Sequence, residues 1–406
     1  MDSGVAVVRE AEVLEVALPL LRAFVTGFGT TKTRRVVLVH LTDEDGNEGW
    51  GEAAPLDHPF YLPETTSGAF AVTSEWALPM ALGAGPEPGA VARSLSSIRG
   101  NTFARAGVEA AFWCLKAARF GCSLAELFAG ASAGAVAGAD ADAVLAGRPD
   151  RRAPSRGRVA VGESIGIHPS IDETVKEAEL RHNDGYRRIK LKISPGWDVE
   201  VVRAVREALP AAVMLQVDAN GSYGDSAADR AALRALDAFG LACIEQPLGW
   251  DDLLGHAELQ ASLDTAICLD ESLRSPADVR RALRLGACRS VNLKPGRVGG
   301  VAASVEIHDL CADEGVPLFC GGMLESGIGR AVNLALCSLP GFTEPADMSP
   351  AALLYAWDLV EPSYEVSPEG TIAVPEAAGL GFSVRLDRVA AQVLRRVNVS
   401  TASPVS

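Results

Sequence analysis

Short apolar segments alternate with amphipathic segments over the second half of the chain. From residue 158 onward, runs of four to six mostly apolar residues end at a charged residue followed by Gly, Pro, Asn or Ser, a pattern typical of buried strands. Stretches with apolar residues three or four apart lie between these runs and predict helices. The predicted strands are 159–167, 187–193, 212–219, 241–246, 266–271, 290–294, 316–322 and a weaker one near 333–343.

This alternation predicts the fold class. Eight strands interleaved with helices favour an α/β fold, a (β/α)8 barrel of the TIM type or its (β/α)7β variant, over an open doubly wound sheet. No Gly-x-Gly-x-x-Gly follows the first strand of the repeat, which removes the main support for a dinucleotide-binding fold. We therefore assign a catalytic barrel to residues 158–364.

The two ends of the chain show a different pattern. Residues 5–56 alternate apolar and polar positions around a turn, which predicts antiparallel strands, and residues 66–120 have helical spacing. The last segment, 365–406, alternates again and ends in a predicted helix at 385–397. We expect this segment to pack on the N-terminal region, so that it and residues 1–130 form an α+β capping domain.

A low-complexity segment separates the two predicted domains. Residues 131–157 consist almost entirely of Ala, Gly, Asp, Arg and Pro. Such a segment cannot bury enough apolar area to offset the entropy lost on ordering. We interpret it as an insertion or linker and assign it no chemistry.

Composition and charge narrow the classes of function. The 406-residue chain has a net charge of −15, which argues against a nucleic-acid partner because phosphate binding needs clustered Lys and Arg. Acidic residues interrupt the N-terminal apolar stretches, and no run approaches the 18 uncharged apolar residues of a membrane span. The eight cysteines contain no Cys-x-x-Cys pair, which favours free thiols. We expect a cytoplasmic protein that acts on a small molecule.

Six charged residues mark the ends of successive predicted strands. From the second of them onward they are spaced 26, 27, 25 and 24 residues apart, which is about one strand and one helix each time. The carboxyl ends of barrel strands meet at one mouth, where barrel enzymes hold their active sites. The six residues are Lys190, Lys192, Asp218, Glu245, Asp270 and Lys294.

The three acids of this set predict a metal site. Asp218, Glu245 and Asp270 come from successive strand ends, so their carboxylates should meet and repel one another unless a cation lies between them. Ligation by oxygen alone favours Mg²⁺, with Mn²⁺ or another divalent cation as alternatives. The competing interpretation, three unrelated surface salt bridges, is disfavoured because an unpaired acid in an apolar strand is costly.

The lysines predict proton transfer. Lys190 and Lys192 are two apart on one strand and therefore face the same way, unless one of them extends outward to solvent. Burial lowers a lysine pKa and neighbouring carboxylates raise it, so the residues alone leave the pKa open. A cation that binds a substrate carboxylate, with an amine on each side, is the arrangement that proton abstraction α to a carboxylate requires.

The motifs around these residues resemble a known family over nearly the whole chain. KLKISPG, QVDAN, IEQPL, CLDES, NLKPGRVGG and CGGMLESGIGRA together resemble the enolase superfamily, muconate-lactonizing-type subgroup. Within that subgroup, GGMLESGIGRA and KPGR resemble the branch of o-succinylbenzoate synthases and N-succinylamino acid racemases. The resemblance implies a lysine base, Mg²⁺, an enediolate intermediate and a small carboxylate substrate. We also expect a homo-oligomer.

The resemblance also implies a role for individual residues. Lys192 and Lys294 would be the acid/base pair, supported electrostatically by Lys190. The Mg²⁺ ligands would be Asp218, Glu245 and Asp270, with Glu271 beside them. Arg297 lies where racemase-competent members have an arginine thought to tune the lysine that corresponds to Lys294. The residues around the substrate would be Phe24, Phe28, Tyr61, Ser164, Gly166, Asn220, Arg297, Gly322, Met323 and Glu325.

Several positions depart from the branch and leave the substrate open. Glu163 stands where an apolar residue is usual, His168 replaces a common Gln, and residues 350–354 lack an Arg often found there. The residues alone also leave open whether the aromatics of segments 24–32 and 55–64 close a pocket or merely cover the capping sheet.

Two reactions fit these residues equally well through the same intermediate. One is racemisation of an N-acyl(succinyl)amino acid, and the other is the dehydration that forms o-succinylbenzoate in the menaquinone pathway; one enzyme can perform both. Arg297 favours racemase competence. Dipeptide epimerisation and cycloisomerisation remain alternatives within the superfamily. A non-catalytic acid-binding barrel is the alternative from another class, and the intact acids and lysines argue against it.

Overall fold

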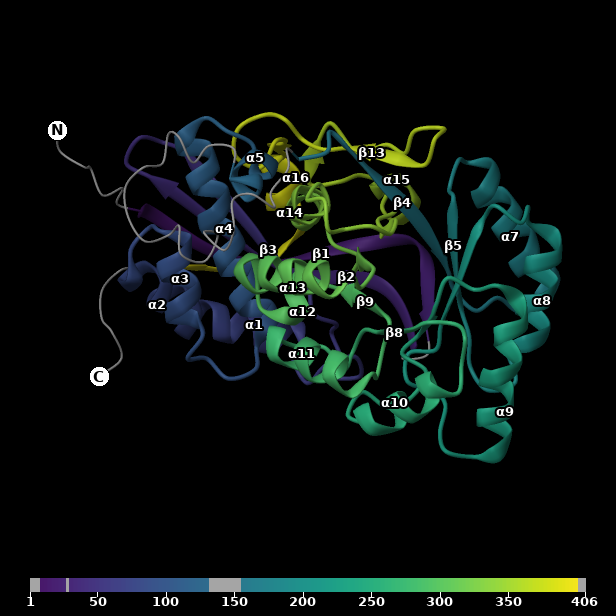
Figure 1. Cartoon of the computed structure of the whole chain (residues 1–406). Helices are drawn as coiled ribbons and strands as arrows, with labels where there is room; N and C mark the ends of the chain where they lie inside the picture. The colour runs from purple at the N-terminus through teal and green to yellow at the C-terminus, as the bar shows by residue number, and fades with distance from the viewer. Residues whose placement is uncertain (1–7, 27–28, 131–154, 401–406) are drawn as a thin grey trace.

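The computed structural model describes residues 8–26, 29–130 and 155–400. Figure 1 shows a barrel with a capping domain packed on one side of it. The barrel strands run parallel in the order β10-β9-β8-β7-β6-β5-β4-β11, so the predicted barrel with its cap is confirmed. These strands are β4 (Arg158–Ile165), β5 (Arg188–Lys192), β6 (Met214–Asp218), β7 (Ile244–Glu245), β8 (Ile267–Leu269), β9 (Ser290–Leu293), β10 (Leu318–Cys320) and β11 (Ala346–Asp347).

Helices between the strands cover the outside of the barrel (Figure 1). In α11, Ser275 caps the N-terminus by accepting a hydrogen bond from the backbone N–H of Asp278, and Pro276 occupies the first turn. Gly286 ends this helix with a φ of 66°, which an L side chain rarely adopts. The covering helices are α7 (Ile171–Asn183), α8 (Val199–Ala208), α9 (Ala227–Ala235), the 3₁₀ turn Leu236–Phe239, α10 (Leu253–Ala261), α11 (Pro276–Leu285), α12 (Pro295–Val298), α13 (Val301–Glu314), α14 (Gly327–Cys337) and α15 (Ala351–Leu354).

The capping domain is an antiparallel sheet with helices packed against it. The sheet has the order β15-β1-β2-β3, with β1 (Val8–Thr26), β2 (Gly29–Asp43), β3 (Glu48–Ala53) and β15 (Val393–Asn398). A Cβ on Gly51 of β3 would lie 2.0 Å from the carbonyl oxygen of Gly107 in α4, so glycine is required for this close approach. The cap helices are α1 (Thr66–Val72), the π-helical turn Thr73–Ala77, α2 (Leu78–Ala84), α3 (Pro88–Leu95), α4 (Thr102–Phe120) and α5 (Leu124–Ala129).

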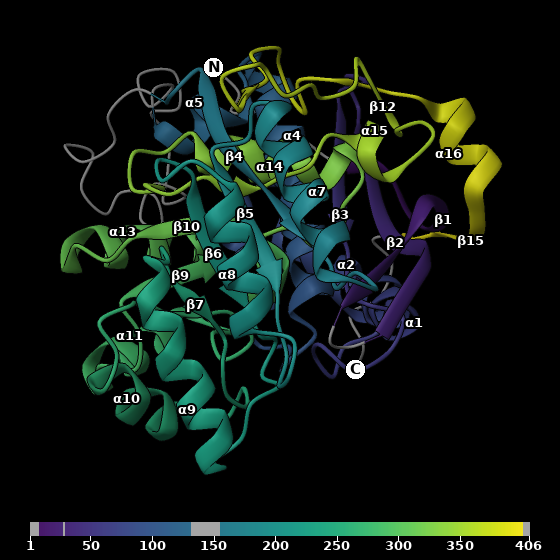
Figure 2. The same cartoon turned by 90° about the vertical axis from the view of Figure 1, so that its right-hand side faces the viewer.

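The C-terminal region connects the barrel to the cap. β12 (Val360–Glu361) pairs with β14 (Ser383–Val384), and β13 (Thr371–Ala373) pairs antiparallel with β4. The predicted helix 385–397 is correct only as far as α16 (Leu386–Gln392), because the rest forms β15 and pairs antiparallel with β1 (Figure 2). The unpaired edge of β1 offers hydrogen bonds that override the local helical pattern of the segment.

A second correction concerns the eighth strand. The weak strand predicted near 333–343 is wrong, because α14 extends to Cys337 and the eighth strand is β11, at Ala346–Asp347. Every residue of α14 is buried, and its last four residues form the apolar run LALC, whose pattern does not distinguish a buried helix from a strand. No helix among the described residues combines the length and the apolar character needed to cross a membrane.

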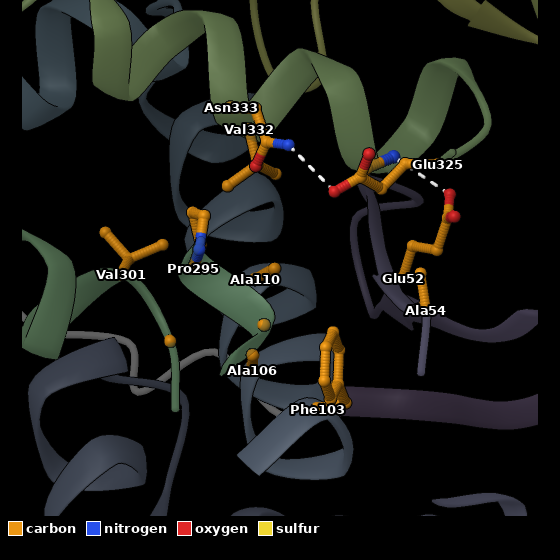
Figure 3. A pocket seen from close by; sticks show the side chains of 13 residues that line it. Glu52, Ala54, Phe103, Ala106, Ala110, Pro295, Val301, Glu325, Val332 and Asn333 are labelled. Atoms are coloured by element: carbon orange, nitrogen blue, oxygen red, sulfur yellow. Dashed lines mark hydrogen bonds between the residues drawn. The ribbon is translucent and has the colours of Figure 1, made fainter. Parts of the chain in front are cut away.

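Glu52 at the end of β3 joins the cap to the barrel. Its carboxylate accepts hydrogen bonds of 3.0 Å from the backbone N–H groups of Ser326 and Gly329, at the start of α14. Figure 3 shows Glu52 and Glu325 at a small interface cavity, which α4 borders with Phe103, Ala106 and Ala110. Burial raises the pKa of Glu52 to about 7, hydrogen bonding from Ser326 opposes the increase, and the charge of Glu325 adds to it.

The raised pKa of Glu52 predicts a pH-dependent stability. A carboxyl that binds its proton more tightly in the folded protein stabilises the fold below pH 4.5, and this contribution is lost as the pH rises to about 7. The free energy of unfolding of Glu52→Gln, relative to wild type, should therefore increase by about 2–3 kcal/mol between pH 4.5 and pH 8. Urea unfolding at the two pH values measures this change. Glu179→Gln, at an exposed position, is the control. If the unfolding free energies of Glu52→Gln and wild type differ by the same amount at both pH values, the prediction is refuted.

Candidate active site

β5 carries two lysines on the inner side of the barrel. Side chains of alternate residues in a strand share a face, and Lys190 and Lys192 both reach the carboxylate of Asp218 on β6. Lys192 also donates to Oδ1 of Asn220 at 2.9 Å. Lys190 donates to Oε2 of Glu245 at 3.1 Å and to the carboxylate of Asp347.

Glu245 at the end of β7 is held by two neutral amides. Its carboxylate accepts from Nε2 of Gln216 at 2.6 Å and from Nδ2 of Asn292 at 2.7 Å, and the residue has no exposed surface. Gln216 is itself positioned by Arg188, which donates to its amide oxygen at 2.9 Å. These bonds fix the carboxylate at the barrel mouth.

Asp270, which directly follows β8, lies in a second group of charges. It accepts hydrogen bonds from the hydroxyl of Tyr61 at 2.7 Å, from Nζ of Lys294 at 2.9 Å and from the guanidinium of Arg297. Nζ of Lys294 lies 4.6 Å from the centroid of the Tyr61 ring. A Cβ on Gly321, which directly follows β10, would lie 2.6 Å from Cε of Lys294. The glycine therefore leaves room for this lysine.

The pKa values of these residues follow from their neighbours. Burial alone would lower the pKa of Lys294, but Tyr61 and two glutamates outweigh it, so the pKa lies above its ordinary value. Burial likewise opposes a raised pKa at Lys190, where Asp347, Glu245 and Asp218 prevail. Lys190 and Lys294 are therefore protonated in this arrangement, and their charges offset those of the acids around them.

The donor set fits a divalent cation, although the described residues contain no ready cluster of three His, Cys, Asp or Glu side chains that could hold one. The described positions of Asp218, Glu245 and Asp270 do not form such a cluster, and each carboxylate is instead paired with a lysine or arginine. All three are buried, lie at adjacent strand ends and offer only oxygen, which suits Mg²⁺.

Glu271, next to Asp270 in the chain, also favours a divalent-cation site. Its Oε1 accepts from Nδ2 of Asn220 at 3.0 Å, whereas its Oε2 is buried with no hydrogen-bond partner among the described residues. Burial raises the pKa of Glu271 to about 7, with a further contribution from the charge of Asp218. A cation at this end of the barrel would compensate the excess of acidic oxygens.

A cavity of about 100 Å³ opens beside the lysines. Of the expected substrate residues, Ser164, Gly322 and Glu325 line it together with Lys190, Lys192 and Lys294. Gly166 and Met323 are not among the described residues that line it, and Met323 packs in the hydrophobic core instead. Phe28 lies outside the described residues, as does the side chain of Phe24, whose backbone pairs with Thr31.

The cavity also contains residues that sequence reasoning left without a role. Glu163 lines it and accepts a hydrogen bond of 2.8 Å from Ser349, and burial raises its pKa to about 7. Asp347 and Arg330 line it as well, from the end of β11 and the first turn of α14. The run CGGMLESGIGRA contains Arg330 and could have indicated it, whereas His168 is half-buried and does not line the cavity among the described residues.

Comparisons with known proteins find similar proteins over nearly the whole chain. Residues 8–129 match the mandelate racemase/muconate lactonizing enzyme N-terminal domain, and residues 173–388 match the enolase C-terminal domain-like family. The chain is 43% identical to an o-succinylbenzoate synthase of Geobacillus stearothermophilus (90% of this chain, 91% of the relative). It is also 43% identical to an N-succinylamino acid racemase of Thermus thermophilus (93% and 95%). A solved enolase-superfamily structure from Listeria innocua is similar, with a TM-score of 0.86 and 34% identity over 97% of this chain and 99% of that one.

Proposed function

The chain belongs to the enolase superfamily, and on that premise we propose that it is a racemase or lyase that moves the proton α to a substrate carboxylate. Lys192 and Lys294 are the proposed acid/base pair. Asp218, Glu245 and Asp270 are the proposed ligands of a divalent cation, Mg²⁺ in the first instance.

The observation that carries the proposal is the placement of the two lysines. Lys192 comes from β5 and bonds to Asp218, whereas Lys294 follows β9 and bonds to Asp270. In the sheet order, β6, β7 and β8 lie between these two strands, so the acids lie between the two amines. A carboxylate held over the acids therefore has an amine on each side, as proton transfer at both faces of one carbon requires.

Each residue contributes a separate part of the mechanism. A cation held by the three acids would stabilise the negative charge that develops on the substrate carboxylate. Lys192 removes the α-proton on one face, and Lys294 delivers or removes a proton on the other. Lys190 is buried against Glu245 and adds positive charge next to the substrate carboxylate. Tyr61 and Arg297 hold Asp270 and so position Lys294.

Two substrate classes are suggested by the similar proteins, an o-succinylbenzoate synthase and an N-succinylamino acid racemase. We propose N-succinylamino acids as substrates for racemisation, and the precursor of o-succinylbenzoate as the substrate for dehydration, by one enzyme or by specialisation to one reaction. Arg297 favours racemase competence through the resemblance, because it stands where racemase-competent members have an arginine. Its guanidinium binds Asp270, the same carboxylate that Lys294 binds. An epimerase or cycloisomerase would use the same lysines with a different pocket.

Parallel assays distinguish these reactions. The Mg²⁺-loaded protein is incubated with each enantiomer of several N-succinylamino acids, and optical activity is followed; o-succinylbenzoate formation is followed separately by absorbance. We expect racemisation of at least one N-succinylamino acid. Dehydration without any racemisation would restrict the protein to the synthase reaction, and neither reaction with any substrate would refute the proposal.

A further inference from the structure

Gln246 carries a side-chain amide that is buried at the barrel mouth and fully hydrogen-bonded. It directly follows Glu245 and has no exposed surface. Its Oε1 accepts from the backbone N–H groups of Asp270 at 3.0 Å and Ser272 at 3.3 Å. Its Nε2 donates to Oγ of Ser272 at 2.8 Å and to the carbonyl oxygen of Leu248 at 3.1 Å. Both donors and both acceptor positions of the amide are therefore used.

The partners of this amide fix its orientation. The backbone N–H groups of Asp270 and Ser272 can only donate, so they require the amide oxygen. The carbonyl of Leu248 can only accept, so it requires the amide NH₂ group. A flipped amide would bring donors against donors and an oxygen against an oxygen.

The amide acts where the backbone pairing of two strands ends. β7 and β8 pair in parallel, and their register runs as far as Glu245 opposite Cys268. The backbone N–H of Gln246 still donates to the carbonyl of Cys268, at 2.8 Å. Asp270 lies beyond this ladder, and the side chain of Gln246 bonds to its backbone N–H in place of a strand partner. One side chain thus links the segment that carries Glu245 to the segment that carries Asp270.

The backbone of Gln246 is held as tightly as its side chain. Its φ is 38°, which residues other than glycine rarely adopt, and such a conformation persists only where its surroundings fix it. The carbonyl of Gln246 accepts from the backbone N–H of Gly221 at 2.7 Å, just after Asp218 at the end of β6. Gln246 therefore contacts the exits of β6, β7 and β8, which carry the three acids.

We propose that Gln246 is a positioning residue that sets the separation of the Glu245 and Asp270 carboxylates for a single Mg²⁺ ion. This inference rests on the proposed function, in which the two acids are cation ligands, and deepens it. Mg²⁺ requires nearly octahedral ligands at about 2.0–2.1 Å, whereas Ca²⁺ accepts a more flexible shell at about 2.3–2.6 Å. A site in which Asp270 is no longer held should therefore lose more affinity for Mg²⁺ than for Ca²⁺.

Calorimetric titration of the metal-free, full-length protein with MgCl₂ and with CaCl₂ tests the inference without a substrate. Gln246→Met keeps the length of the side chain and loses every hydrogen bond of the amide. Its Kd for Mg²⁺ should rise by about 10- to 100-fold, and its Kd for Ca²⁺ by less. Gln246→Glu keeps the oxygen that accepts from Asp270, so the ratio of its two Kd values should stay closer to that of wild type. The added charge acts on both divalent cations and largely cancels in this ratio.

The matched control is Gln260→Met. Gln260 is 2% exposed, and its amide accepts from the backbone N–H of Ile267 at 2.7 Å and donates to the carbonyl of Thr265 at 3.1 Å, at the opposite end of β8. Its replacement removes a buried amide of the same kind and should leave the Kd for both cations unchanged. Thermal unfolding shows which variants are folded. If Gln246→Met is not, Gln246→Asn, which is one methylene too short to reach Asp270, should show the same loss.

Two results would overturn the inference while the proposed function stands. One is a Kd for Mg²⁺ in the folded Gln246 variants that equals the wild-type value. The other is an equal loss of Mg²⁺ affinity in Gln246→Met and Gln260→Met, which would reduce the role of Gln246 to general stability. If wild type itself binds no Mg²⁺, the proposed cation site fails, and the role of Gln246 fails with it.

Discussion

Replacement of either proposed base is expected to stop proton exchange on one face of the substrate. In Lys294→Ala, exchange of one enantiomer of an N-succinylamino acid should fall by at least about 1000-fold, whereas the other enantiomer continues to exchange through Lys192. Lys192→Ala should show the opposite preference. The reason is that the two amines lie on either side of the acids, so each reaches one face only. Exchange of the α-proton followed by NMR in D₂O measures both rates.

The matched control for these variants is Lys176→Ala. Lys176 is exposed on α7, on the outside of the barrel. The Lys176→Ala variant should therefore exchange the α-proton of both enantiomers at wild-type rates. If Lys192→Ala and Lys294→Ala both lose exchange of the same enantiomer, or if neither variant loses activity, the assignment of one lysine to each face of the substrate is wrong.

Removal of divalent cations is expected to have an effect of similar size. Treatment with a chelator should lower exchange of both enantiomers by at least about 1000-fold, because the negative charge on the substrate carboxylate is then uncompensated, and Mg²⁺ should restore it. The chain's own acids supply a readout that does not need activity. Mg²⁺ at 100 times its dissociation constant should raise the free energy of unfolding by about 2.7 kcal/mol.

Glu245→Gln separates this site from adventitious binding of the cation. The substitution keeps the size of a residue that has no exposed surface and is bonded to Gln216 and Asn292, but it removes a negative charge. Stabilisation by Mg²⁺ should then be largely lost. Equal stabilisation of the variant and wild type would place the cation elsewhere.

The sequence predicts the barrel and its charged mouth because both depend on local pattern. An apolar run that ends in a charge, such as the one before Asp218, marks a buried strand and its exit at the same time, and the structure has β6 ending at that residue. The pattern fails where a strand is too short to form a run. β11 consists of Ala346 and Asp347 alone, so Asp347 was not recognised as a residue of the mouth.

Other features depend on contacts between distant segments. Val393–Asn398 forms a strand because β1 offers a free edge, and this pairing partner cannot be identified from the residues of the last segment. Arg330 follows a glycine near the start of a helix, where an arginine is usually exposed, and its burial results from the packing of α14 between the barrel and the capping domain. The pairing of Asp218, Glu245 and Asp270 with cations likewise depends on side-chain geometry that residue types alone do not determine.

The most direct test of the central claim is α-proton exchange by the wild-type protein. With Mg²⁺ in D₂O, both enantiomers of an N-succinylamino acid should lose their α-proton NMR signal, and both should gain deuterium at that carbon. The account predicts exchange from both faces that depends on Lys192 and Lys294. If no N-acylamino acid or related carboxylate exchanges, and Lys192→Ala changes nothing, the assignment of this barrel mouth to proton transfer is contradicted.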